Sequence, residues 1–404
     1  MSDQRAIGGG AAGGTGAGGA EEPASPVTAQ AEAAAGRAPE DGIALCLSGG
    51  GYRAMLFHLG ALWRLNEAGY LRRLQRISSV SGGSITAGVL GAAWPSLRFD
   101  ADDVAGGFAE AVVAPVRRIA AATIDRGSVL RGLVLPGTVS ARLARAYDRL
   151  AFDGRSLQDL PADGEGPRFV LNATNLQTGT LWRFSRPYMA DYRVGRVDNP
   201  EVSLATAVAA SSAFPPFLSP LLLKVDAGAY SAESAAWELH RKPFTTRVHL
   251  SDGGVYDNLG LETAWKRYRT VLVSDGGGQM APVRRPPRTW ARHSLRVLTV
   301  IDNQVRSLRK RQVIAGLQRS DRDGTYWGIR TDVADYGLAD PLPCPHPQAL
   351  ALAALPTRLR ALPTRQQEAL INWGYAVCDA AMRRWVDPAL PRPADFPYPA
   401  VRLG

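Results

Sequence analysis

The hydrophobic positions alternate between short apolar runs and longer stretches with helical spacing. Four short runs, each bounded by turn-forming or polar residues, are typical of buried strands: residues 43–47, 74–80, 168–173 and 180–184. Leucines recur at helical spacing between residues 56 and 65 and predict a helix over residues 52–68, and residues 82–94 predict a second helix. This alternation of strands and helices predicts an α/β fold with a mostly parallel central sheet and helices on both faces.

The second half of the chain continues the pattern. Residues 247–250 and 271–273 predict two short strands, and each is followed by Asp-Gly-Gly. Residues 295–301 are strand-like and precede a basic helix, and residues 365–384 predict an amphipathic helix near the C-terminus. The segment 281–292, rich in Pro and Arg, predicts a surface loop.

Composition divides the chain into two parts. Residues 1–41 are mostly Gly, Ala, Pro, Ser and Glu, and they are expected to be disordered because they hold too little apolar surface to form a core. Residues 42–404 are expected to form one α/β domain. The 404-residue chain has a net charge of +10, but its acidic tail carries six acidic and two basic side chains, which leaves +14 on the rest.

Several classes of function are disfavoured. The three cysteines are too few and too widely spaced for a disulfide framework or a zinc knuckle, and the five histidines show no metal-binding spacing, so we expect no metal and no cofactor. No apolar run is long enough for a transmembrane helix, and the first residues do not have the pattern of a secretory signal. These features favour a cytoplasmic or peripheral-membrane protein.

A glycine loop joins the first predicted strand to the first helix. Gly49, Gly51 and Ala54 fit the dinucleotide fingerprint, but the second strand ends in Ile-Ser-Ser and lacks the acidic residue that NAD or FAD binding requires. A run of backbone amides at a helix N-terminus also suits an oxyanion hole, because glycines allow a developing negative charge to approach closely. A tight turn without a ligand remains the alternative.

A serine-rich turn follows the second predicted strand. Residues 79–83 read Ser-Val-Ser-Gly-Gly, which fits the nucleophile elbow G-x-S-x-G at Ser81, except that Ser79 occupies the first glycine position. A serine N-cap without chemistry is the alternative.

The serine needs a base, and two aspartates are candidates. Asp252 and Asp275 each follow a short strand and begin an Asp-Gly-Gly sequence, and spacing alone does not choose between them. A triad that uses His293 or His346 is less favoured because neither lies in a turn of small residues, and His58 lies in the middle of a predicted helix.

Together these motifs resemble the patatin-like phospholipases, over roughly residues 42–317. That family combines a G-G-G-x-R loop, a G-x-S-x-G serine and an Asp of D-G-G/A. Residues 172–179 (N-A-T-N-L-Q-T-G), 209–216 (A-A-S-S-A-F-P-P) and 252–258 (D-G-G-V-Y-D-N) are similar to further family segments. The resemblance implies a three-layer patatin-like fold and a Ser–Asp dyad, and it favours Asp252 because Asn258 follows there.

The resemblance also implies roles for individual residues. Ser81 would attack the ester carbonyl and Asp252 would accept its proton, which requires a partly desolvated carboxylate in contact with the serine. Arg53 would support the loop or bind a phosphate headgroup. The expected oxyanion donors are Gly49, Gly50, Gly51 and Gly82, and the expected supporting residues are Gly253, Gly254 and Asn258.

The leading hypothesis is therefore a serine acyl hydrolase that acts on lipid esters, as a phospholipase A or lipid esterase. The alternative is a catalytically silent patatin-like protein that binds a lipid or a partner. The basic body favours an anionic membrane surface, and residues 284–296 combine arginines with Trp290 in a candidate interfacial patch. A solvated basic face is the competing interpretation of that patch, and no nucleic acid partner is expected.

Overall fold

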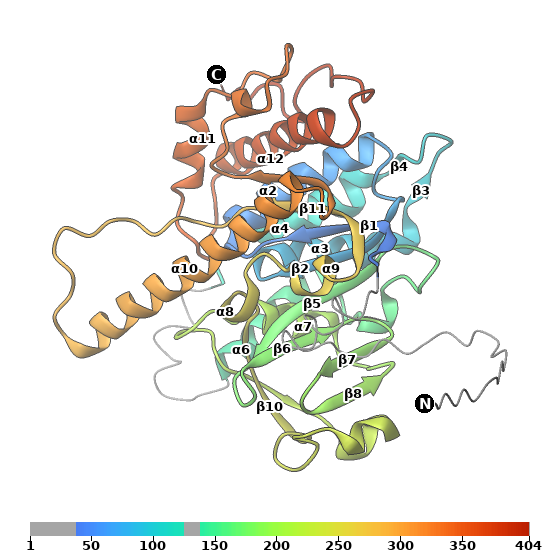
Figure 1. The fold of residues 1–404 in the computed structure, drawn as a ribbon, viewed down its shortest axis with the longest axis vertical. Coiled ribbons are helices and arrows are strands. Elements are labelled where there is room, and N and C mark those ends of the chain that lie inside the picture. The colour runs from blue at the N-terminus through green and yellow to red at the C-terminus, as the bar shows by residue number, and fades with distance from the viewer. Residues whose placement is uncertain (1–37, 125–137, 404) are drawn as a thin grey trace, which may run out of the picture.

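A mixed sheet lies at the centre of the fold (Figure 1). The computed structural model describes residues 38–124 and 138–403, so most of the tail that we expect to be disordered lies outside the described residues. The strands of the main sheet are β1 (Glu40–Leu47), β2 (Leu74–Val80), β5 (Arg168–Asn175), β6 (Thr180–Phe184), β7 (Tyr188–Asp191), β8 (Gly195–Asp198), β9 (Leu221–Lys224), β10 (Arg247–Asp252), β11 (Tyr268–Asp275) and β12 (Asp323–Gly328). A separate hairpin pairs β3 (Arg98–Phe99) with β4 (Ala105–Gly106).

The described helices surround this sheet. They are α2 (Gly51–Glu67), α3 (Gly82–Ala93), α4 (Ala114–Ala120), α6 (Thr138–Tyr147), α7 (Leu204–Ser211), α8 (Gly254–Asp257), α9 (Glu262–Trp265), α10 (Trp290–Gln318), α11 (His346–Ala353) and α12 (Thr364–Trp385). In the part of the chain that the structure describes, none of them combines the length and apolar character needed to cross a membrane.

The sheet has a parallel half and an antiparallel half. Strands β12, β11, β1, β2 and β5 are neighbours in that order, and all of them run parallel. The order continues through β6, β7 and β8, which are antiparallel, and β10 pairs antiparallel with both β5 and β9. The predicted parallel α/β sheet is confirmed in the centre of the fold, whereas the antiparallel extension was not predicted.

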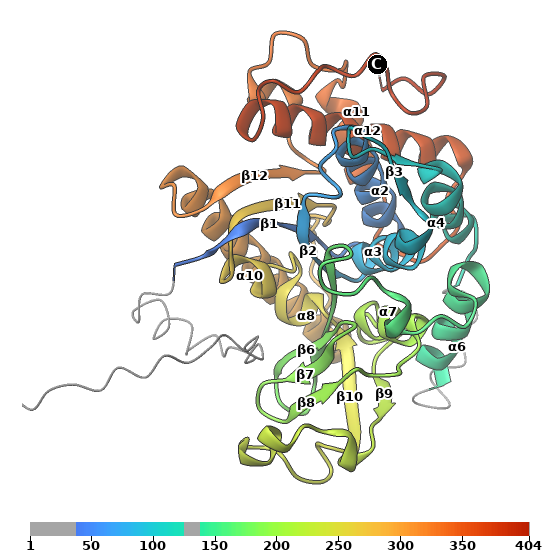
Figure 2. The ribbon, with the colours of Figure 1, turned by 90° about the vertical axis from the view of Figure 1, so that its right-hand side faces the viewer.

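The two faces of the sheet are buried against different helices, because successive strand residues point to opposite sides. Leu45 and Leu47 of β1 belong to a core that includes α2 and α3. Ala44 and Cys46, which alternate with them, belong to a second core with residues of α9 and with Val313 of α10. Figure 2 shows the same division, with α2, α3 and α4 on one side of the strands and α8 and α10 on the other. This arrangement confirms three layers with helices on both faces.

The predicted C-terminal helix is present as α12, and it crosses α2 at very short range. A Cβ atom at Gly60 would lie 1.9 Å from the carbonyl oxygen of Ile371, and one at Gly374 would lie 1.9 Å from that of Phe57. Two glycines thus let the helix backbones touch. The end of the chain is thereby packed directly onto the helix that begins at the glycine loop.

Two predicted boundaries are wrong. The strand expected at residues 295–301 is part of α10, where Leu298 and Ile301 are 60% and 53% exposed and therefore lack the burial that a core strand requires. The first strand begins at Glu40 instead of residue 43, because the Glu40 amide donates to the Arg267 carbonyl at 2.7 Å and extends the ladder. That residues 42–404 form a single domain stays a prediction.

Candidate active site

Two strand ends meet against one edge of β5 and create the site. β2 ends at Val80, which pairs with Asn172, and β10 ends at Asp252, which pairs with Ala173. Because β6 occupies the other edge of β5 over residues 171–175, β2 and β10 share the same edge and point toward each other. Ser81, the first residue after β2, is therefore placed beside Asp252.

Ser81 occupies a strained turn. Its φ of 52° and ψ of −118° lie outside the regions that an L-residue prefers, and α3 begins at the next residue. Its backbone amide donates to the hydroxyl of Ser211 at 3.0 Å, and its side chain remains partly accessible, with 8% of the residue exposed. The turn has the sharp strand-to-helix geometry that a nucleophile elbow requires.

A chain of serine hydroxyls supports this turn. The Ser211 hydroxyl donates to the Asn172 carbonyl at 2.6 Å, so it must accept from Ser84, 2.8 Å away. Ser84 in turn lies 3.0 Å from Ser79. Ser79, the departure from the G-x-S-x-G pattern, is thus accommodated by a buried hydroxyl partner. Ser211 was not among the predicted site residues, and its one signal in the sequence is the similarity of residues 209–216 to a family segment.

Asp252 is buried, and only one of its two carboxylate oxygens accepts an ordinary hydrogen bond from the described residues. Its Oδ1 accepts the Gly254 amide at 2.7 Å, whereas Oδ2 has no ordinary hydrogen-bond partner among the described residues. Burial raises the pKa of Asp252 to about 7, the negative charge of Asp302 adds to this increase, and the Gly254 amide and the Ser81 side chain oppose it. A carboxylate that titrates near neutral pH beside a serine is suited to act as a base.

Gly253, Gly254 and Asn258 form the closely packed turn that follows Asp252. A Cβ atom at Gly253 would lie 2.3 Å from the Asn172 carbonyl oxygen, so only glycine fits where β10 meets β5. At Gly254 a Cβ atom would lie 2.6 Å from Asn258 Oδ1 and 3.0 Å from Asp252 Oδ1. The structure therefore brings the three predicted supporting residues together around the carboxylate.

The glycine loop lies against the serine. A Cβ atom at Gly49 would be 3.2 Å from Ser81 Cβ and 2.4 Å from Asn258 Oδ1, and the Gly49 amide donates to the Asn258 carbonyl at 3.0 Å. Gly51 and Gly82 are the first residues of α2 and α3, where the helix supplies no acceptor for their amides. A Cβ atom at Gly82 would be 3.0 Å from the Gly51 nitrogen, so two helix N-termini converge beside Ser81.

Arg53, two residues after the glycine loop, is buried with its guanidinium bonded to protein acceptors. It is 2% exposed, and its guanidinium donates to the Gly276 carbonyl at 3.2 Å, to Thr357 Oγ1 at 3.0 Å and to the Leu355 carbonyl. Burial, together with the positive charge of Arg306, lowers the pKa of Arg53 to about 10. Because the protein already supplies these acceptors, the geometry supports the first expected role, loop support, and gives no access to a phosphate headgroup.

Comparison with known proteins agrees with the motifs. The family model described as patatin-like phospholipase matches residues 45–265, more than half of the chain. The chain belongs to the patatin-like phospholipase family. Membership supports a lipid acyl hydrolase as the general class of function. No curated protein sequence matches this patatin-like chain.

Solved structures that resemble the patatin-like chain are distant in sequence. Human GIVD cytosolic phospholipase A2 in complex with methyl gamma-linolenyl fluorophosphonate is 13% identical, with 87% of this chain and 60% of that chain covered and a TM-score of 0.48. A second structure of the human enzyme is 15% identical, with 59% and 46% covered and a TM-score of 0.39. VipD from Legionella pneumophila is 14% identical, with 86% and 67% covered and a TM-score of 0.35. The chain spans less than two thirds of the human enzyme.

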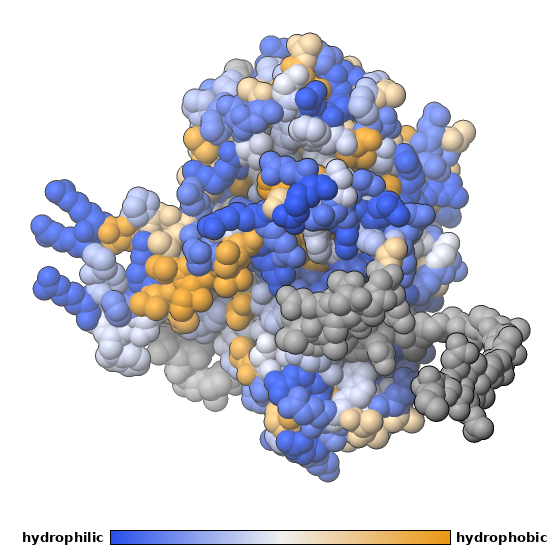
Figure 3. All heavy atoms as spheres, in the orientation of Figure 1, coloured by the Kyte–Doolittle hydropathy of each residue, from blue (hydrophilic) through white to orange (hydrophobic). Residues whose placement is uncertain are grey.

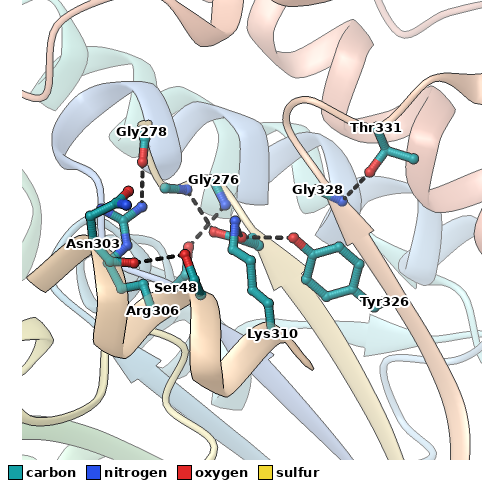
Figure 4. Close-up of polar contacts among 12 residues, drawn as sticks. Ser48, Gly276, Gly278, Asn303, Arg306, Lys310, Tyr326, Gly328 and Thr331 are labelled. Carbon is teal, nitrogen blue, oxygen red and sulfur yellow. Dashed lines mark hydrogen bonds and ion pairs between the residues drawn. The ribbon is translucent and has the colours of Figure 1, made fainter. Parts of the chain in front are cut away.

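The second Asp-Gly-Gly of the patatin-like chain has a different environment (Figure 4). Asp275 pairs with Lys310 Nζ at 2.5 Å and accepts the Tyr326 hydroxyl at 2.8 Å. Burial opposes ionisation, but Lys310 and Arg306 outweigh it and hold the pKa of Asp275 well below its usual range. A carboxylate that is already neutralised by a lysine is a poor base, which matches the structural role expected for Asp275.

The histidines do not complete a triad within the described chain. His58 is buried, with Nε2 donating to the Ser48 carbonyl at 2.9 Å and Nδ1 accepting from the Ser274 hydroxyl at 2.8 Å, and burial lowers its pKa to about 4. His346 lies 3.5 Å from Asp332, and neither it nor His293 is among the groups that shift the pKa of Asp252. No cluster of His, Cys, Asp or Glu in residues 38–124 and 138–403 is arranged to hold a metal ion.

Proposed function

We propose that this chain is a serine acyl hydrolase that cleaves carboxylic ester bonds of lipids, as a phospholipase A or lipid esterase. In the first step Ser81 Oγ attacks the ester carbonyl carbon while Asp252 Oδ2 takes the hydroxyl proton. The tetrahedral intermediate then collapses, and protonated Asp252 returns that proton to the departing alkoxide. Water attacks the acyl-enzyme in the same way, so that the products are a fatty acid and an alcohol or lysolipid.

One observation carries this proposal. A serine in a strained turn is placed against a buried carboxylate whose second oxygen has no ordinary hydrogen-bond partner among the described residues. The pKa of Asp252, raised to about 7 chiefly by burial, gives the carboxylate enough basicity to accept a proton and enough acidity to release it near neutral pH. Neither the open oxygen of Asp252 nor its raised pKa would benefit a turn whose role was only structural.

We further propose that the oxyanion is bound by the amides of Gly50, Gly51 and Gly82. Gly51 and Gly82 begin two helices, so their amides point out of the helix ends, and the two helix dipoles add positive potential there. The Gly49 amide is engaged with the Asn258 carbonyl, so Gly49 supports the site by fitting closely against Ser81 instead of donating to the oxyanion.

The substrate that we propose is a lipid ester or phospholipid presented at an anionic membrane surface. The excess of +14 outside the tail supports this choice, since a basic surface is attracted to anionic lipid. A silent lipid-binding or partner-binding protein remains the alternative that an activity test must exclude.

The test compares ester hydrolysis and covalent labelling. Wild type is expected to hydrolyse nitrophenyl esters and to be labelled once by a fluorophosphonate, whereas Ser81→Ala should do neither. The matched control is Ser84→Ala, which removes the next hydroxyl of the same turn and should still be labelled. Equal rates for wild type and Ser81→Ala, or labelling at another serine, would overturn the proposal. An inactive, unlabelled wild type would support the silent alternative.

A further inference from the structure

The N-terminal half of α10 projects from the body of the protein (Figure 1). Within this described helix only Val313 and Gly316, both near its C-terminal end, are buried. The helix contacts β12 and α8, whereas every residue from Ala291 to Leu295 is exposed. Helices in proteins owe most of their stability to a buried face. The projecting half has no such face in the isolated chain.

An apolar stripe runs along α10 from Trp290 to Leu308. At the helical repeat, its members fall within about 100° of arc, the width of the face that a surface helix normally buries. The side chains of the stripe are Trp290, Val297, Leu298, Ile301, Val305 and Leu308. Trp290 is 83% exposed and Leu308 is 52% exposed, so the stripe is open to solvent from one end to the other. Figure 3 shows apolar surface gathered on the projecting helix.

Basic side chains occupy the opposite side of the helix and the segment that leads into it, because at about 100° per residue Arg292 and Arg296 point away from the stripe. Between Asp275 and Asp302 the sequence contains five arginines and no acidic residue: Arg284, Arg285, Arg288, Arg292 and Arg296. None of these arginines forms an ion pair within the described part of the chain. Their charge is therefore available to an external anion. A helix with an apolar face, arginines on its polar face and an indole at one end has the composition of helices that lie in a membrane interface.

This helix is close to the candidate active site. α10 contacts α8, the short helix that begins two residues after Asp252, and the charge of Asp302 on α10 raises the pKa of Asp252. Val255 on α8 is 48% exposed. Phe214, 56% exposed, directly follows the residue whose carbonyl accepts the Asp252 amide. A surface that settles on the stripe of α10 is thus brought near Asp252.

We propose that the exposed stripe of α10 and the five arginines of residues 284–296 dock the protein on an anionic phospholipid surface, with the apolar side chains at the boundary between headgroups and acyl chains. This inference rests on the proposed function only for what the docked enzyme then cleaves. A second copy of the chain is a poorer occupant, because each projecting segment carries five arginines and no acidic side chain between Asp275 and Asp302, so two copies would repel each other. Anionic lipid supplies both the opposite charge and the apolar layer.

Vesicle binding tests the proposal without turnover. Ser81→Ala protein is expected to sediment with vesicles of phosphatidylcholine and phosphatidylglycerol in equal parts, and much less with phosphatidylcholine alone. Adding Leu298→Ser and Ile301→Ser, or Arg292→Gln and Arg296→Gln, should weaken binding about tenfold or more. Leu222→Ser, which removes an exposed leucine on β9, is the matched control and should bind as before.

The outcomes separate docking from catalysis. Active protein with the α10 substitutions should hydrolyse a soluble ester at the wild-type rate but lose hydrolysis of vesicle phospholipid in proportion to binding. Vesicle binding unaffected by both pairs of substitutions would overturn the docking proposal, as would a stripe that only mediates dimers in sedimentation velocity. Intact docking by a protein that hydrolyses no ester would instead overturn the proposed function.

Discussion

Replacing Asp252 with Asn should remove activity and, above neutral pH, make the protein more stable. The amide keeps an acceptor for the Gly254 N–H but cannot ionise. In wild type the folded pKa is about 7 against an ordinary value of 3.8, and burial is the chief cause. Because the folded value is the higher one, the stability contribution of this carboxyl is complete below about pH 4 and is lost as pH rises through about 7.

The size of this effect follows from the two pKa values. Their difference of about 3 corresponds to about 4 kcal/mol, at about 1.36 kcal/mol per unit of pKa. Most of this free energy of unfolding is lost between about pH 4 and pH 7, where the unfolded chain is ionised and the folded carboxyl is still protonated. Asp252→Asn should escape that loss, so its advantage over wild type should grow across this interval and then level off.

Urea unfolding of wild type and Asp252→Asn at a series of pH values measures this difference directly. Asp275→Asn is the control of opposite sign: Asp275 is held ionised by Lys310, so its replacement should lower stability at neutral pH by about 1–3 kcal/mol. A constant difference in the free energy of unfolding between wild type and Asp252→Asn from pH 4 to 8 would refute the reasoning.

The same carboxyl should set the pH dependence of activity. The kcat/KM of wild type should rise with pH to a plateau with a midpoint near 7, and Asp252→Asn should lower kcat/KM about 100-fold or more.

Three further substitutions test the parts around the dyad. Gly49→Ala would place a methyl group 2.4 Å from Asn258 Oδ1, and it should cut hydrolysis of a soluble ester about tenfold or more while the fold survives by circular dichroism. Ser211→Ala removes the acceptor of the Ser81 amide, so kcat should fall with KM little changed and the pH midpoint kept, as expected of a positioning residue. Arg53→Lys cannot reproduce the forked contacts to Gly276 and Thr357, so activity should fall equally on uncharged and phosphate-bearing esters. A loss confined to phosphate-bearing esters would restore the headgroup role.

The hydrophobic pattern predicted those parts of the site that depend on residues adjacent in the sequence. The strand from Leu74 to Val80 and the helix that starts at Gly82 have the bounds expected from the pattern, because an apolar run closed by small residues encodes a strand-to-helix turn by itself. The meeting of Ser81 with Asp252 was expected only through resemblance to a family. Its physical cause is the pairing of two strands with β5, which periodicity does not reveal.

Other features depend on contacts distant in the sequence. The burial that raises the pKa of Asp252 and the acceptors that surround Arg53 come from segments far along the chain, including Leu355 and Thr357 beyond the family match. The strand expected at residues 295–301 was wrong because β-branched residues favour strands only where a pleated, half-buried surface receives them. In this protein those residues lie on a projecting helix.

Because β2 and β10 meet end to end along β5, the proposed hydrolysis depends on the register in which β10 pairs with β5. Successive side chains of a strand point to opposite faces, so a slip of one residue between β10 and β5 would turn the Asp252 carboxylate away from Ser81 and bring a neighbour into its place opposite Ala173. A chain with the right secondary structure and the wrong register would therefore be folded in appearance but inactive. During refolding, hydrolysis should return only with the final alignment of the sheet, later than the recovery of helical signal.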